Sequence, residues 1–235
     1  MHKKYLLLLL VTVFINSENL GAEHDLSSIL NSVFVKHDNM EKSIKNVEYL
    51  GHFKYWEFTP DFDTTKTIYT LRKIYAQSYD QQHYEYLEAK INGRFLSKEE
   101  ISKEFKAQPE KTYTFWPFSS RYRNDYEFSY LGEDSFYSSK VSIIGFKPKK
   151  RTRHYIEGQA KILLKDSSVV EINFRPAVLP FLIKNFDAQL SYFKINNFWV
   201  PKKFYSSMRI ELKFLLKLTE KFIKMEEEYS DYKFY

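Results

Sequence analysis

The chain has 235 residues, a formal net charge of +6 at pH 7 and no cysteine. Without cysteine it can form neither a disulfide nor a lipid-modified N-terminal cysteine. The charge comes from 36 basic and 30 acidic side chains, a mixture too balanced to indicate a nucleic-acid-binding protein.

Residues 1–22 are predicted to be a secretory signal peptide. Two lysines precede an apolar run over residues 5–15, and a polar stretch then ends at Ala22. The apolar run is shorter than the roughly 20 residues that span a bilayer, so a permanent transmembrane anchor is the weaker interpretation. Cleavage leaves residues 23–235, enough for one domain with a sizeable core. We therefore expect a soluble, monomeric protein of the periplasm.

An amphipathic helix is predicted to open the mature chain. Apolar side chains recur with helical spacing, and Asp25 precedes them as an N-cap. These side chains belong to Leu26, Ile29, Leu30, Val33 and Phe34. Met40 and Ile44 indicate a further helical turn or two.

Three strands are predicted to follow this helix. The first runs over residues 47–58, and Pro60 begins the turn after it. Residues 66–79 and 82–91 are dense in Tyr, Ile and Thr, with frequent alternation of apolar and polar side chains. This pattern is typical of two neighbouring antiparallel strands.

A turn and a short helix are predicted near residue 100. Asn92 and Gly93 form a strong turn signal. Ser97 and Glu100 have the spacing of a capping box, which predicts a helix over residues 98–106.

The segment after that helix is rich in aromatic side chains. Residues 112–122, TYTFWPFSSRY, alternate too little for an ordinary strand, and Trp116 and Phe118 flank Pro117. We expect this loop at the rim of the concave face of a sheet. Its rings either plug one end of the sheet or form a gate that moves when a ligand enters. Strands are predicted to resume near Tyr126.

Residues 144–174 hold the clearest local structure in the sequence, three consecutive strands. Pro148 ends the first strand, and residues 166–168 make a hairpin turn between the other two. The apolar positions that alternate with polar neighbours are Ala160, Ile162 and Leu164, and then Val170, Ile172 and Phe174.

The longest alternation lies in the last quarter of the chain. Helical spacing competes with it over residues 212–225, but the uninterrupted alternation before them favours a strand. The apolar parity is occupied by Phe204, Met208, Ile210, Leu212, Phe214, Leu216 and Leu218. Together these elements predict an α+β fold of about ten strands with two or three helices.

No catalytic motif is found in the sequence. The histidines lie singly, and the glycines never cluster into a phosphate-binding loop. Glu133 with Asp134, and residues 226–228 with Asp231, are explained at least as well by acidic turns and solvated strand ends as by paired catalytic carboxylates. We therefore predict that the protein is not an enzyme and uses no metal or cofactor.

A basic run stands out over residues 147–153. Its simplest interpretation is a solvated strand end, and the alternatives are contact with an acidic partner or with anionic lipid headgroups. The run contains Lys147, Lys149, Lys150, Arg151 and Arg153.

Several segments resemble the periplasmic LolA and LolB lipoprotein-carrier superfamily, which includes the N-terminal domain of the envelope-stress regulator RseB. They are NGRFLSKEE at 92–100, YEFSYL at 126–131, IIGFKPK at 143–149, FWVPKKF at 198–204 and YSDYKFY at 229–235. The resemblance implies an unclosed, strongly curved antiparallel sheet, a half-barrel, whose concave apolar face is covered by helices and accepts acyl chains. The lipid anchor of LolB and the second domain of RseB have no counterpart here, and no arginine is assigned to the cavity arginine of LolA.

Two functions follow from this resemblance. The first is a carrier that holds a lipid or a lipoprotein acyl chain, because each buried CH₂ contributes about 0.8 kcal/mol. Its expected lining is Ile162, Leu164, Ile172, Phe174, Ile210, Leu212 and Phe214, although for any single one of them core packed against the helices is the favoured interpretation. The second is an interaction or sensor module of the envelope, which would grip a protein partner through the basic run and an open sheet edge.

Overall fold

The computed structural model describes residues 26–43, 46–78, 81–105, 116–214 and 217–235. The predicted signal peptide, the Asp25 cap and the first part of the aromatic loop lie outside the described residues. Within those ranges, no helix has both the length and the apolar character needed to cross a membrane.

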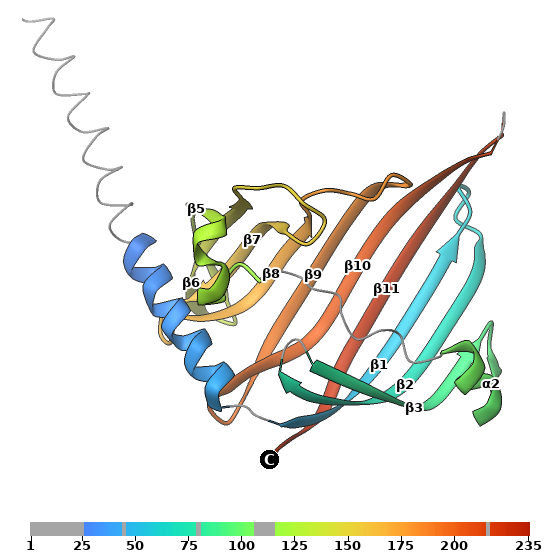
Figure 1. Cartoon of the computed structure of the whole chain (residues 1–235), viewed down its shortest axis with the longest axis horizontal. Helices are drawn as coiled ribbons and strands as arrows, with labels where there is room; N and C mark the ends of the chain where they lie inside the picture. The colour runs from blue at the N-terminus through green and yellow to red at the C-terminus, as the bar shows by residue number, and fades with distance from the viewer. Residues whose placement is uncertain (1–25, 44–45, 79–80, 106–115, 215–216) are drawn as a thin grey trace, which may run out of the picture.

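The described chain forms one unclosed antiparallel sheet of eleven strands (Figure 1). The strand order is β4-β3-β2-β1-β11-β10-β9-β8-β7-β6-β5, so β4 and β5 are its two edges. The strands are β1 (Val47–Phe58), β2 (Thr64–Ser78), β3 (Gln81–Ile91), β4 (Arg94–Phe95), β5 (Tyr126–Phe136), β6 (Ser139–Pro148), β7 (Ile156–Leu163), β8 (Ser168–Pro176), β9 (Ile183–Ile195), β10 (Phe198–Phe214) and β11 (Lys217–Phe234). The predicted combination of an unclosed antiparallel sheet with few helices is confirmed.

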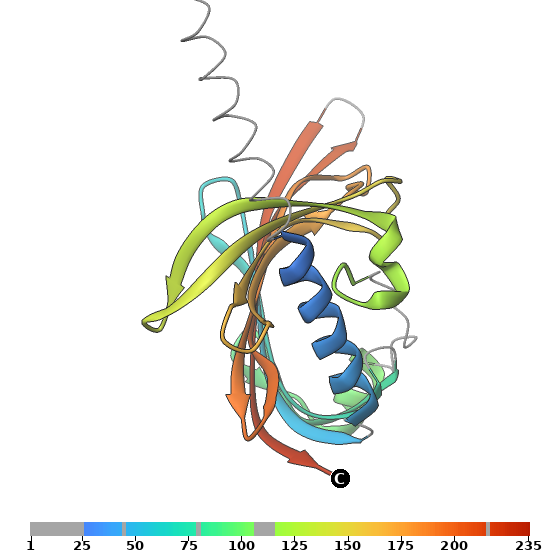
Figure 2. The same cartoon turned by 90° about the vertical axis from the view of Figure 1, so that its left-hand side faces the viewer.

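Helix α1, residues 26–43, lies along one face of the sheet (Figure 2). We call this face the inner face and the opposite one the outer face. The predicted helical stripe is buried against strands β5 to β9, where the Phe34 ring meets the edge of Phe128 with 5.9 Å between ring centroids. The largest core cluster combines Ile29, Leu30, Val33 and Phe34 with Phe118, Tyr126, Ile144, Phe146, Ile156, Ala160, Ile162, Ile172 and Tyr192.

The signals of the N-terminal half are confirmed. Strands β1, β2 and β3 stand where three strands were predicted, and Asn92 and Gly93 turn with φ angles of 49° and 82°. Helix α2 (Lys98–Glu104) begins with the predicted capping box. In it, the backbone N of Glu100 donates to Ser97 Oγ at 3.2 Å, and the backbone N of Ser97 donates to Glu100 Oε2 at 2.8 Å.

The central and C-terminal strands are also confirmed, with two corrections. The helical alternative for residues 212–225 is wrong, because the described residues there lie in β10 and β11. The long alternation is two strands and not one, since Phe214 pairs with Lys217 and the chain reverses between them. A short 3₁₀ helix, η1 (Ser120–Asp125), stands where the sequence indicated an irregular loop.

Candidate functional site

The predicted lining residues lie in different surroundings. Ile162 and Ile172 are fully buried in the core that α1 covers, and Phe174 is half-buried and packs against that core. Ile210 is half-buried on β10, farther along the sheet. Two of the seven therefore lie within the core itself, beneath the helix.

Leu164 does not join this group. Strand β7 ends at Leu163, and its register with β8 shifts between Lys161 and Ile162. Leu163 is buried against Val141 and Val170, whereas Leu164, beyond the end of the strand, is 38% exposed. The side chains of Leu212 and Phe214 lie outside the described residues, although their backbone belongs to β10.

The two aromatic residues proposed for the rim belong to the same core cluster. Phe118 is fully buried, with its ring centroid 5.8 Å from that of Phe146. Trp116 is half-buried, packs against the cluster and lies 6.3 Å from Phe118 between ring centroids.

A buried ion pair occupies the inner face away from α1. Arg72 of β2 and Glu227 of β11 are joined by hydrogen bonds from Arg72 Nη2 to Glu227 Oε1 and Oε2, both 2.7 Å, and from Arg72 Nε to Glu227 Oε1, 2.9 Å. Their side chains are only 18% and 7% exposed. A buried charge is costly unless it is paired, so this pair is the most demanding polar feature of the inner face.

Gly51 makes room for this pair. Strand β1 lies between β2 and β11, and Gly51 is the cross-strand partner of both Arg72 and Tyr229. A Cβ atom at position 51 would approach Glu227 Oε1 to 2.5 Å and Ile74 Cδ1 to 2.9 Å. The arginine therefore reaches the glutamate over a strand whose side chain is missing at the crossing point.

Aromatic rings surround the pair. The Arg72 guanidinium lies 5.4 Å from the ring centroid of Phe53 and 4.7 Å from that of Tyr84, within the range of cation–π attraction. Tyr229 Oη donates to Glu227 Oε2 at 3.0 Å. Burial raises the pKa of Tyr229 well above its usual value, and the charge of Glu227 adds to that rise. Burial alone would lower the pKa of Arg72, but the charge and hydrogen bonds of Glu227 outweigh it and raise that pKa.

A strip of half-buried apolar side chains adjoins the ion pair. Cross-strand pairing places Phe204, Glu227 and Phe53 in one row, and Met225 and Tyr55 in the next. Phe204 in turn pairs with Leu190, which packs against the core under α1, so these rows face the inner side. Within the described residues, the members of this strip belong to none of the buried clusters; they are Phe53, Tyr55, Ile68, Phe204, Met208, Ile210 and Met225.

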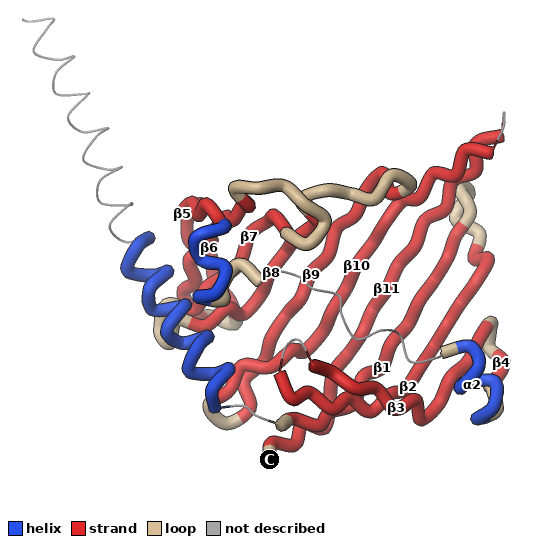
Figure 3. The backbone as a smooth tube through the Cα atoms, in the orientation of Figure 1, coloured by secondary structure: helices blue, strands red, loops and turns tan. Residues whose placement is uncertain are grey.

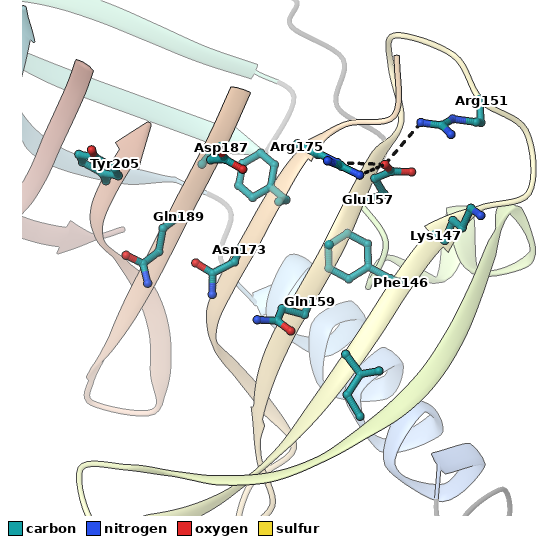
Figure 4. A pocket seen from close by; sticks show the side chains of 14 residues that line it. Phe146, Lys147, Arg151, Glu157, Gln159, Asn173, Arg175, Asp187, Gln189 and Tyr205 are labelled. Atoms are coloured by element: carbon teal, nitrogen blue, oxygen red, sulfur yellow. Dashed lines mark hydrogen bonds and ion pairs between the residues drawn. The ribbon is translucent and has the colours of Figure 1, made fainter. Parts of the chain in front are cut away.

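The outer face carries a groove of about 770 Å³, lined by both polar and apolar residues (Figure 4). Cross-strand partners Gln159, Asn173 and Gln189 lie along it. Glu157 at one end accepts hydrogen bonds from Arg175 Nε at 3.1 Å and from Arg151 Nη2 at 3.4 Å. This carboxylate is thus held between two arginines, while Leu131, Phe146 and Phe174 add apolar surface to the same groove.

His37 is a buried titratable group on α1. Burial lowers its pKa to about 4, while the charge of Asp38 acts in the opposite direction. Ligand atoms of His37, Asp38 and Glu41 lie within 4.8 Å of one another, but Glu41 is exposed and such surface groups are common, so we assign no metal site to them.

Sequence reasoning missed the ion pair. Acidic turns and solvated strand ends were expected to explain residues 226–228 at least as well as paired carboxylates, and this is wrong for Glu227, which is 5% exposed. Glu226 and Glu228 do pair with Lys203 of the neighbouring strand β10, each at 3.1 Å. Strict alternation along β11 was the available signal, since it places Glu227 on the face opposite to its two neighbours.

Comparisons with known proteins add matches to solved structures only. No model of a known protein family matches the sequence, and no curated protein is significantly similar to it. A LolA superfamily protein from Nitrosomonas europaea matches with 12% identity and a TM-score of 0.45, over 87% of this chain and 93% of that chain. A domain named for outer membrane lipoprotein sorting, from Vibrio parahaemolyticus, matches with 11% identity and a TM-score of 0.42, over 87% and 91%.

MucB also matches, with 11% identity and a TM-score of 0.27, over 87% of this chain and 93% of that chain. At these identities and TM-scores, the matches carry no activity, ligand or partner over to this chain. They name the lipoprotein-sorting superfamily that the sequence segments resemble.

Proposed function

We propose that the protein is an exported binding protein that holds a lipid or an acyl chain on the inner face of its sheet. The observation that carries this proposal is the strip of half-buried apolar side chains on β1, β2, β10 and β11, beside the Arg72–Glu227 pair. In this proposal the sheet acts as a strongly curved half-barrel, and the protein works in the periplasm after residues 1–22 are removed.

The apolar strip supplies the binding free energy. A methylene group gains about 0.8 kcal/mol on burial, so about ten methylenes along the strip would gain about 8 kcal/mol before the cost of association. Flexible Met208 and Met225 adapt to chains of different shape. The core beneath α1 is already filled, so we assign Ile162 and Ile172 to the wall that supports the strip.

The ion pair supplies a polar point beside the apolar strip. Phe53 touches both, because it pairs across the strands with Glu227 and its ring lies under the Arg72 guanidinium. An amphipathic ligand would lay its chain along the strip and bring its polar end toward Arg72. Such ligands combine one apolar and one polar region, as this face does.

Direct extraction tests the proposal. The mature protein, purified without detergent, is extracted with organic solvent, the extract is examined by mass spectrometry, and the emptied protein is titrated with a fluorescent fatty acid. We expect a co-purified lipid and saturable binding. If neither a co-purified lipid nor saturable fatty-acid binding is found, the proposal is wrong.

Two neighbouring residues of β10 provide a matched pair of variants. Phe204→Ser removes an aromatic ring from the inner face, and Tyr205→Ser removes one from the outer face. We expect the first variant to bind the fatty acid about tenfold more weakly and the second to bind it normally. Equal affinities in the two variants would contradict an inner-face site, provided that thermal unfolding shows both to be folded.

A second candidate function is an envelope protein-interaction module. Strand β5 is an edge strand of eleven residues, and no described strand pairs with it on the side away from β6. Such an edge accepts a partner strand. Lysines at the exposed edge positions, Ser129→Lys with Leu131→Lys, should abolish recovery of a partner from envelope extract. Recovery of the same protein by the lysine variant would exclude strand addition at β5.

A further inference from the structure

Two loops at one end of the sheet carry exposed apolar and basic side chains. In the β8–β9 loop, residues 177–182, Val178 is 42% exposed, Phe181 91% and Leu182 42%. In the β6–β7 loop, residues 149–155, Lys149, Lys150, Arg151 and Arg153 are exposed. We propose that these two loops dock the protein onto an anionic lipid surface. We call them the docking end.

Hydrogen bonds hold the two loops together. The backbone N of Ala177 donates to the carbonyl oxygen of Tyr155 at 2.8 Å. The Arg151 guanidinium donates to the carbonyl oxygen of Ala177 through Nε at 2.9 Å and through Nη2 at 2.6 Å. Figure 3 shows both loops in tan, side by side at the same end of the strands. The apolar and basic side chains therefore form one surface.

The backbone presents Phe181 outward. The N of Ile183 donates to the carbonyl oxygen of Pro180 at 2.9 Å, which closes a turn around Phe181. The N of Glu211 donates to the carbonyl oxygen of Leu182, also at 2.9 Å, and so ties the end of the loop to β10. Single exposed apolar residues are ordinary, but three within six residues, on a loop fixed at both ends, leave a patch that needs a cover.

The charge beside this patch has one sign. Arg151 shares Glu157 with Arg175, whereas Lys149, Lys150 and Arg153 form no ion pair with a described residue. Anionic headgroups attract such cations, while large apolar side chains next to them enter the boundary between headgroups and acyl chains. Nucleic acid would satisfy the cations but offer nothing to Val178, Phe181 and Leu182. The combination favours a lipid surface.

This inference is independent of the proposed ligand site. The docking end consists of loops beyond the strand ends, and the apolar strip lies on the inner face of β1, β2, β10 and β11. Loss of vesicle binding therefore leaves fatty-acid binding unchanged, and the two results can be told apart.

Co-sedimentation with vesicles tests the inference. The mature protein is mixed with vesicles of phosphatidylcholine alone, or of phosphatidylcholine with phosphatidylglycerol, at low and high salt. We expect binding to the mixed vesicles at low salt, with a large part lost at high salt as the charges are screened. The double variant Phe181→Ser/Lys150→Glu should bind at least tenfold more weakly, an estimate based on about one buried aromatic ring and one reversed charge.

The opposite end of the sheet supplies the control. Tyr137, in the β5–β6 turn, is 79% exposed, and its Oη lies 3.5 Å from Lys202 Nζ. Tyr137→Ser/Lys202→Glu thus also removes one exposed ring and reverses one lysine. It should bind vesicles like the unmodified protein, and both double variants should keep the unmodified melting temperature.

Three results would overturn the inference. They are no binding of the unmodified protein to the mixed vesicles, equal binding to the two vesicle types, and a loss of binding in the control variant as large as in the test variant. Binding to protein-containing envelope fragments alone, without binding to protein-free vesicles, would also overturn it and assign the docking end to a protein partner.

Discussion

The two halves of the inner face have the same strand pattern but different contents. Beneath α1, strands β5 to β9 contribute fully buried apolar side chains such as Ile162 and Ile172. Farther along, β2, β1, β11 and β10 contribute a smaller buried cluster of Val47, Tyr49 and Ile74, the strip of half-buried apolar side chains, and the Arg72–Glu227 pair. Period-2 alternation therefore determines which face a side chain occupies. Contact with α1 then distinguishes the core of β5 to β9 from the half-buried strip on the other strands.

The largest expected effect concerns the Arg72–Glu227 pair, on the half of the inner face away from α1. Glu227→Ala leaves the Arg72 guanidinium buried and unpaired, which should lower the free energy of unfolding by about 3–5 kcal/mol. Glu228→Ala, on the outer face one residue away, should cost less than about 1 kcal/mol, because its side chain is 59% exposed. Urea unfolding of both variants measures the difference.

A double variant sharpens this result. Arg72→Met with Glu227→Leu removes both charges, and it should recover most of the stability that Glu227→Ala loses. If Glu227→Ala proved no more damaging than Glu228→Ala, the ion pair would not distinguish this half of the face from the outer surface.

The next prediction compares one substitution in each half of the inner face. Ile172→Ala opens a cavity in the filled core and should cost about 2–4 kcal/mol. The Ile210 side chain on β10 is only half-buried. Ile210→Ala should therefore lower the free energy of unfolding by about 1 kcal/mol and should also weaken fatty-acid binding. Chemical denaturation and ligand titration of both variants separate core from lining, and equal costs would remove the distinction between the halves.

Mild acid should destabilise the covered half through His37. Its pKa is about 4 in the folded protein and about 6.5 when unfolded, so the unfolded chain binds the extra proton between these values. Stability should therefore fall as the pH decreases from about 6.5 toward 4, by about 2 kcal/mol at pH 5 relative to pH 7. A His37→Gln variant should lack this part of the pH dependence in thermal unfolding, and an unchanged profile would contradict the assignment.

The smallest effect decides between the two roles of the aromatic loop. Trp116 is half-buried, so Trp116→Ala should cost about 2 kcal/mol, roughly half the value for a fully buried ring. A plug predicts this loss of stability with unchanged fatty-acid binding, whereas a gate predicts near-normal stability with weaker retention. A variant unchanged in both measurements would mean that Trp116 has neither role.

Local patterns predicted most of the fold because strands and caps are encoded by neighbours in sequence. The alternation over residues 156–176 and the Ser97–Glu100 box needed no knowledge of distant contacts. Leu164 was placed wrongly in β7 because alternation along one strand does not show where pairing with its neighbours stops, which is after Leu163. Arg72 and Glu227 are separated by 155 residues in the sequence. They meet only because β1 pairs with β2 on one side and with β11 on the other.

Because of the close packing at Gly51, substitutions at positions 51, 72 and 227 depend on one another. Any larger side chain there would displace the Glu227 carboxylate, which approaches a Cβ at this position to 2.5 Å. A change at position 51 therefore demands a change at position 227, and loss of the glutamate in turn leaves Arg72 without its counter-charge. In related sequences we expect glycine, arginine and glutamate to be present together or replaced together at these three positions.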